Sequence, residues 1–121
     1  MANSGKRTIH VTKRFAKDYR SLLKKHFDPA LVRSALEALS DADGDTLATK
    51  YRDHALVGQW RGFRELHVSA DVLLVYMADS DSVAVVAVRL ASHDTLFSNR
   101  IGKRDVREYL AEARELLESL K

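Results

Sequence analysis

The sequence has no cysteine, a single proline and no long apolar segment. Without cysteine the protein can form neither disulfide bonds nor thiolate metal sites, and catalysis by a thiol is excluded. No apolar run approaches the roughly 18 residues that a membrane-spanning helix requires. Residues 1–7 also lack the apolar core of a signal peptide, so we expect a cytoplasmic protein with no membrane partner.

Charge is only mildly unbalanced, with a formal net charge of +3 and a pI of about 9.3. By itself this balance is weak evidence for a nucleic-acid partner. Its distribution is more informative, because residues 50–64 contain a single acid, Asp53, among several cations. These cations are Lys50, Arg52, Arg61 and Arg64.

A chain of 121 residues is long enough for one domain with a modest core. We interpret residues 1–121 as a single domain, with residues 103–121 as a C-terminal helical extension. Residues 6–11 alternate in the manner of a strand. Residues 13–26 have apolar side chains at helical spacing, with Thr12 as a plausible N-cap.

The one proline follows an aspartate, and Asp28 with Pro29 predicts the start of a second helix that continues to about Ser40. So short a link predicts an antiparallel pair of helices. Residues 41–45 resemble a calcium-binding loop, but Arg52 occupies the position that requires glutamate, which argues against calcium. Residues 46–60 show no clear period, and we interpret them as a loop.

Three strands are predicted in the second half, at residues 61–68, 72–77 and 82–90. The last two are apolar on both faces, which indicates a sheet that is covered on both sides. The helix pair covers one side. A helix at residues 103–120 is expected to cover part of the other side. We expect this side to carry Val75, Met77, Val85 and Ala87.

Residues 92–97 form a short turn or helix between the last strand and the last helix. The element order is therefore β-α-α-β-β-β-α. Helices that are grouped early and strands that are grouped late indicate an α+β fold with an antiparallel four-stranded sheet.

Three of the five histidines, His54, His67 and His93, lie near strand ends or in loops between residues 50 and 97. Histidine transfers protons near neutral pH, and arginine binds phosphate with a planar, permanently charged fork. Asp71 lies near His67 across a turn and could orient its imidazole. Such a set suits acid–base chemistry on RNA, although each histidine by itself also fits an ordinary surface position.

A zinc site made of these histidines and Asp71 is the alternative chemistry. No two of these residues have a short helical spacing, so we expect no metal and no cofactor.

The order of the residues resembles a known family. The patterns YRDHxLxGxWRGFR at residues 51–64, HVxxD at 67–71 and RxxSHxxLF at 89–97 resemble the YafQ branch of the RelE/ParE toxin superfamily. The resemblance extends from the first strand to Phe97. It implies a compact RelE-like fold and a type II toxin that acts as a ribosome-dependent mRNA endonuclease, or mRNA interferase.

The reaction that the resemblance implies is attack of a ribose 2′-OH on its own phosphodiester, without metal. The acid and base roles fall to His54, His67 and His93 together with Asp71. Arg89 would stabilise the phosphorane, and Phe97 would stack on a base or anchor the loop. Lys50, Arg52, Arg61 and Arg64 could follow RNA phosphates or form a solvated rim.

The implied partners are mRNA in the ribosomal A site, the 16S rRNA and an acidic cognate antitoxin, and we expect the free protein to be monomeric. The chain departs from the family pattern at Val72 and Ala91 and by the 24 residues after Phe97. A ParE-like inhibitor of DNA gyrase is one alternative, although gyrase binding needs no histidines. A catalytically silent module that binds RNA or a partner is the other.

Overall fold

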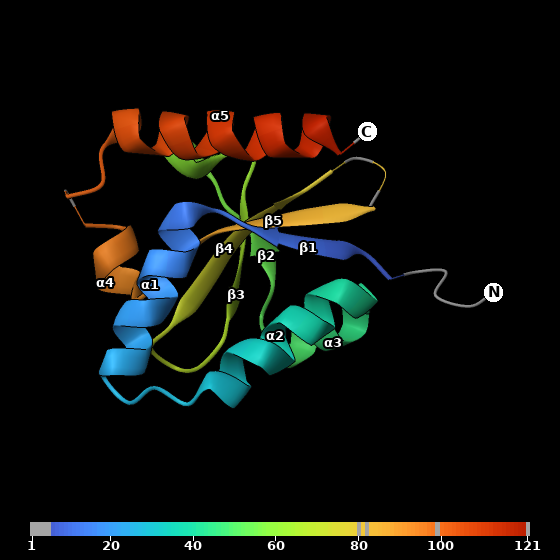
Figure 1. Ribbon diagram of the computed structural model, residues 1–121, viewed down its shortest axis with the longest axis vertical. Coiled ribbons are helices and arrows are strands. Elements are labelled where there is room, and N and C mark those ends of the chain that lie inside the picture. The colour runs from blue at the N-terminus through green and yellow to red at the C-terminus, as the bar shows by residue number, and fades with distance from the viewer. Residues whose placement is uncertain (1–5, 80, 82, 99, 121) are drawn as a thin grey trace.

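The computed structural model describes residues 6–79, 81, 83–98 and 100–120. Helices lie on both faces of one mixed sheet, which confirms the α+β class (Figure 1). The strands are β1 (Thr8–Val11), β2 (His54–Ala55), β3 (Arg64–His67), β4 (Leu73–Ala78) and β5 (Ala84–Ala91). The helices are α1 (Lys13–Lys24), α2 (Pro29–Asp41), α3 (Gly44–Thr49), α4 (His93–Leu96) and α5 (Lys103–Ser119), with a 3₁₀ turn η1 (Gly58–Trp60).

The two helix starts that were predicted from local sequence are confirmed. The Thr12 hydroxyl accepts a hydrogen bond from the backbone N–H of Phe15 at 3.1 Å and caps α1. The Asp28 carboxylate accepts from the N–H of Ala30 at 2.9 Å, and Pro29 occupies the first turn of α2, where its missing N–H costs nothing.

The expected loop at residues 46–60 is wrong in part, because α3, β2 and η1 lie there or overlap it. The carboxylate of Asp43 accepts hydrogen bonds from the N–H groups of Asp45 and Thr46 and starts a six-residue helix. Helices and strands of two to six residues are too short to produce a hydrophobic period.

The sheet has five strands in the order β1-β5-β4-β3-β2, where four had been expected. The β3–β4 and β4–β5 pairs are antiparallel as predicted, but β1 pairs with β5 in parallel. The entirely antiparallel sheet is therefore wrong. Hydrophobic alternation defines a strand but does not identify its neighbour, and β2 consists of only two residues. The predicted beginning of the last strand at Ser82 lies outside the described residues.

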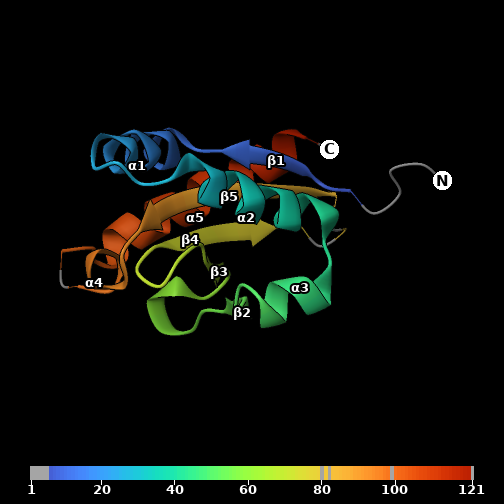
Figure 2. The ribbon, with the colours of Figure 1, turned by 90° about the horizontal axis from the view of Figure 1, so that it is seen from below.

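Each face of the sheet packs against helices, as the doubly apolar strands predicted (Figures 1 and 2). The helices α1, α2 and α3 cover one face, and α5 lies across the other. Val75 and Met77 pack on the α5 side as expected, but Val85 and Ala87 face the other helices. The assignment of Val85 and Ala87 to the α5 side is wrong because of the strand register. Met77 pairs with Val86, so Val86 shares its face, and the register shifts between Val75 and Tyr76. No helix in the described part of the chain is long and apolar enough to cross a membrane.

Candidate active site

The strand register brings the three candidate histidines to one end of the sheet. His67, the last residue of β3, lies opposite Leu73, which in turn lies opposite Ala91 at the end of β5. His93 follows Ala91 by two residues and begins α4. His54 in β2 pairs with Glu65 of β3, and the rings of His54 and His67 are 6.5 Å apart.

His54 is held at both of its ring nitrogens. Its Nδ1 lies 2.8 Å from the carbonyl oxygen of Arg52, which can only accept, so Nδ1 carries a hydrogen. Its Nε2 lies 3.0 Å from Oε2 of Glu65. This contact pairs the imidazole with a carboxylate oxygen. The pair is accessible from the protein surface, because the side chain of His54 is half exposed.

Glu65 was not among the site residues predicted from the sequence. Its side chain is buried, and its Oε1 makes no hydrogen bond to any residue that the structure describes. The available signal was strand alternation, since Glu65 and His67 are two residues apart and share one face of β3. A buried carboxylate on the same face as a candidate catalytic histidine indicates a role for that carboxylate.

The backbone before His54 has an uncommon conformation. Arg52 has φ of 53°, in the left-handed region that a non-glycine residue adopts at a cost. Asp53 fixes this turn: its Oδ1 accepts from Nε of Arg64 at 2.7 Å, and its Oδ2 accepts from the hydroxyl of Tyr76. Left-handed backbone supported by a hydrogen-bond network places His54 against Glu65.

The pKa is shifted in two members of this network, Arg64 and Tyr76. Burial alone would lower the pKa of Arg64, but its hydrogen bond and charge interaction with Asp53 outweigh this and raise it. Burial, and then the hydrogen bond to Asp53, raise the pKa of Tyr76 well above its usual range. Arg64, which was expected to bind RNA, has its guanidinium held by Asp53 at 2.7 Å.

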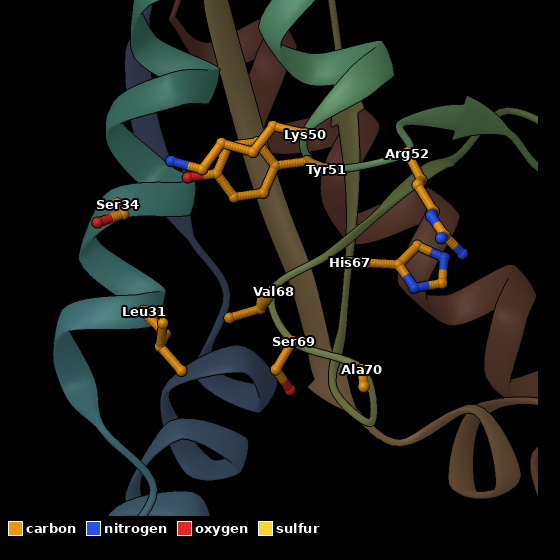
Figure 3. A pocket seen from close by; sticks show the side chains of 9 residues that line it. All are labelled: Leu31, Ser34, Lys50, Tyr51, Arg52, His67, Val68, Ser69 and Ala70. Carbon is orange, nitrogen blue, oxygen red and sulfur yellow. The ribbon is translucent and has the colours of Figure 1, made fainter.

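His67 is half-buried and borders a pocket between α2 and the β3–β4 turn (Figure 3). Its ring points away from α2, whereas Lys50 and Arg52 lie on the rim and are exposed. The expected pairing of His67 with Asp71 is absent: Asp71 is exposed, and within the described ranges no carboxylate contacts His67. Arg61 is also exposed, directly after η1.

His93 begins α4 and Phe97 directly follows it, one helical turn later, with ring centroids 4.8 Å apart. The Ser92 hydroxyl accepts from the N–H of Thr95 at 3.1 Å and caps this short helix. Phe97 also meets Trp60 edge-on at 5.7 Å, so one side of its ring anchors the segment while the residue remains partly exposed.

Arg89 lies deeper than the sequence suggested, with only 1% of its surface exposed. Asp18 of α1 accepts from its Nε at 2.7 Å and its Nη2 at 3.2 Å, and the hydroxyl of Tyr109 accepts from its Nη1 at 2.9 Å. Burial alone would lower the pKa of Arg89, but the bond and charge of Asp18 outweigh this and raise it. The high cost of an unpaired buried arginine is avoided because Asp18 pairs with it.

In the part of the chain that the structure describes, no group of three or more histidine and carboxylate side chains is arranged to hold a metal ion. Both ring nitrogens of His54 already have partners, so neither presents a free lone pair.

The sequence matches the model of one protein family over residues 7–98, a family described as the bacterial toxin of type II toxin–antitoxin system, YafQ. Among curated proteins, the mRNA interferase toxin YafQ of Escherichia coli K12 is 31% identical over 70 residues, which cover 58% of this chain and 75% of that protein.

Solved structures with the same fold include the E. coli DinJ–YafQ toxin–antitoxin complex, with a TM-score of 0.66 and 28% identity. The match covers 77% of this chain and 99% of that one. A metal-bound toxin from Helicobacter pylori has a TM-score of 0.66 and 40% identity, over 74% of this chain and 98% of that toxin. The family match ends at residue 98, before α5 begins at Lys103.

Proposed function

Because this chain belongs to the YafQ family of type II toxins, we propose that it cleaves mRNA on the ribosome, without metal, through acid–base catalysis by histidine. The observation that carries the proposal is the convergence of His54, His67 and His93 at one end of the sheet, where none of them is buried. E. coli YafQ is named an mRNA interferase, which supports the endoribonuclease activity.

Cleavage by the ribose 2′-OH requires one group to remove its proton and another to protonate the leaving 5′ oxygen. Two imidazoles, one neutral and one protonated, perform both transfers near neutral pH. Glu65 orients the imidazole of His54, which would serve as proton donor or acceptor, with His67 beside it and His93 at the same end of the sheet. Asp71, which is exposed in the β3–β4 turn, would contribute negative charge at this end of the sheet without pairing directly with His67.

Phe97 would stack on a base beside His93, using the part of its ring that Trp60 does not cover. Arg89 enters the proposal as the cation that stabilises the phosphorane. A guanidinium has five N–H groups, and Asp18 and Tyr109 engage three of those of Arg89. It would act through the two that remain.

Lys50 and Arg52 would bind backbone phosphates of mRNA or 16S rRNA at the pocket beside His67, with Arg61 as a further exposed cation. Arg64 would act indirectly, by holding Asp53 and hence the turn that carries His54. The proposed setting is the A site of a cytoplasmic ribosome, with the free toxin as a monomer.

A cognate antitoxin follows from membership in a type II toxin family, and the DinJ–YafQ complex is a structural example of such a pair. Among the alternatives, a ParE-like gyrase inhibitor needs no set of exposed histidines. A catalytically silent binding module would not need an exposed histidine that contacts a buried carboxylate.

The test is cleavage of mRNA on programmed ribosomes by the wild type and by His67→Ala and His93→Ala. Both variants should remain folded and lose cleavage by about a hundredfold or more, as expected for loss of a general acid or base. His10→Ala is the matched control, since His10 lies on β1 at the opposite edge of the sheet from β2. A folded His67→Ala or His93→Ala protein with wild-type cleavage would refute the assignment.

A further inference from the structure

The helix α5 begins after the family match ends at residue 98. Its start is well defined: Oδ2 of Asp105 accepts from the N–H of Gly102 at 3.0 Å, a capping contact at the first turn. Leu110 then packs close to the backbone of Gly62, where an added Cβ would lie 3.3 Å from it. This helix is thus seated directly on the segment that connects η1 to β3.

A continuous row of rings extends from α5 to the candidate active site. Tyr109 stacks on Trp60 with centroids 6.0 Å apart, Trp60 meets Phe97 edge-on at 5.7 Å, and Phe97 contacts the ring of His93 at 4.8 Å. Trp60 is 3% exposed and is the only tryptophan in the sequence. Its ring is therefore the physical link between Tyr109 and α4.

The helix α4 depends on such support because it has four residues. A helix of this length is unstable by itself, and its position is set by packing. Within the described residues, its apolar anchors are Leu96, which is fully buried, and Phe97, which rests on Trp60. The direction of the His93 ring follows from where Phe97 is held.

Tyr109 also reaches the second element of the candidate site. Its hydroxyl accepts from Nη1 of Arg89 at 2.9 Å, and the guanidinium lies 5.6 Å from its ring centroid. One residue outside the family match therefore contacts both the arginine and the aromatic row that ends at His93.

We propose that Tyr109 is a positioning residue for RNA cleavage, which makes α5 a working part of the active site. Its hydroxyl orients Arg89, and its ring, through Trp60 and Phe97, orients His93. This inference depends on the proposed function, because it assigns a role to residues that this function uses.

Two substitutions separate the two contacts. Tyr109→Phe keeps the stacking on Trp60 and removes only the bond to Arg89, so kcat should fall about tenfold while KM changes less than about twofold. Tyr109→Leu removes both contacts. It should lower kcat further, shift the His93 ring signals in NMR spectra and alter the Trp60 fluorescence, while the His54 signals remain unchanged.

Leu117→Ala is the matched control, because Leu117 is a buried residue of α5, about two helical turns beyond Tyr109, and lies beside Asp79 and Ala84 at the β4–β5 turn. It should lower the melting temperature without moving the His93 signals or kcat. The proposal fails if Tyr109→Leu leaves the His93 signals and kcat unchanged, or if Leu117→Ala reduces kcat as much as Tyr109→Leu. It also fails if Tyr109→Phe raises kcat. An inactive wild type would refute the proposed function, and the NMR comparison would still decide whether Tyr109 positions His93.

Discussion

The buried pair of Asp18 and Arg89 provides a prediction that separates stability from catalysis. The side chains are 9% and 2% exposed and form two hydrogen bonds, with Nε of Arg89 2.7 Å from Oδ2 of Asp18. We consider Asp18→Leu, Arg89→Met and the double variant. Asp18→Leu leaves the Arg89 guanidinium buried without its carboxylate, and Arg89→Met leaves Asp18 with the half-exposed Arg14 at 3.5 Å, whereas the double change removes both charges.

Breaking a buried ion pair from one side costs about 3–5 kcal/mol of unfolding free energy. Asp18→Leu should lie at the upper end, because Arg89 keeps only Tyr109 as a hydrogen-bond partner among the described residues. The N–H of Leu90 also loses its 2.9 Å bond to Asp18. Arg89→Met should cost less, since Asp18 keeps the N–H of Leu90 and the ion pair with Arg14 at 3.5 Å. The double variant should recover most of the loss, with about 1 kcal/mol remaining for the unpaired Leu90 amide.

Unfolding in urea measures these differences, since a change in midpoint at constant m-value reports stability. Cleavage of ribosome-bound mRNA should remain lost in the double variant, because methionine offers no N–H group to a phosphorane. If each single variant lowers the unfolding free energy by less than about 1 kcal/mol, the Asp18–Arg89 pair does not behave as a buried ion pair. A stable double variant with wild-type cleavage would show that Arg89 is structural only.

Three further predictions follow from the site. Glu65→Gln should keep the fold and lower cleavage at least about tenfold, because it removes the carboxylate charge that His54 contacts at 3.0 Å; unchanged kcat would contradict this. Because the pKa of Tyr76 is raised, the folded state keeps a proton that the unfolded state loses above pH about 10. The unfolding free energy, measured in urea, should therefore fall as the pH rises above about 10, and Tyr76→Phe should make that decline smaller. Cleavage should survive chelation of transition metals when magnesium sufficient for the ribosome is retained; loss of cleavage that zinc restores would overturn the metal-free mechanism.

Local signals in the sequence were sufficient for the elements that depend on neighbouring residues. Thr12 and Asp28 identified two helix starts, because a capping side chain acts on backbone groups within three residues of itself. The doubly apolar strands β4 and β5 likewise predicted a second helical layer, which α5 provides.

Interactions between distant residues were not visible in this way. Arg89 is conspicuous in an apolar strand, but its partner Asp18 lies 71 residues earlier, in a helix whose other charges are solvated. The parallel pairing of β1 with β5 is also long-range and carries no local signal. Glu65 is the instructive case, because alternation along β3 already placed it on the same face as His67. Only the pairing of β2 with β3 shows that it belongs with His54.

The most direct test of the central claim is the chemistry at the cleavage site. An mRNA with a single 2′-deoxy nucleotide at the scissile position is placed on the ribosome, and the fragments are compared with those of the unmodified message. If the ribose 2′-OH is the nucleophile and histidines move the protons, the modified message should remain intact. The unmodified message should yield an upstream fragment that ends in a 2′,3′-cyclic phosphate. Cleavage of the deoxy-substituted message at the same position would contradict the account, since the attacking oxygen would then come from water.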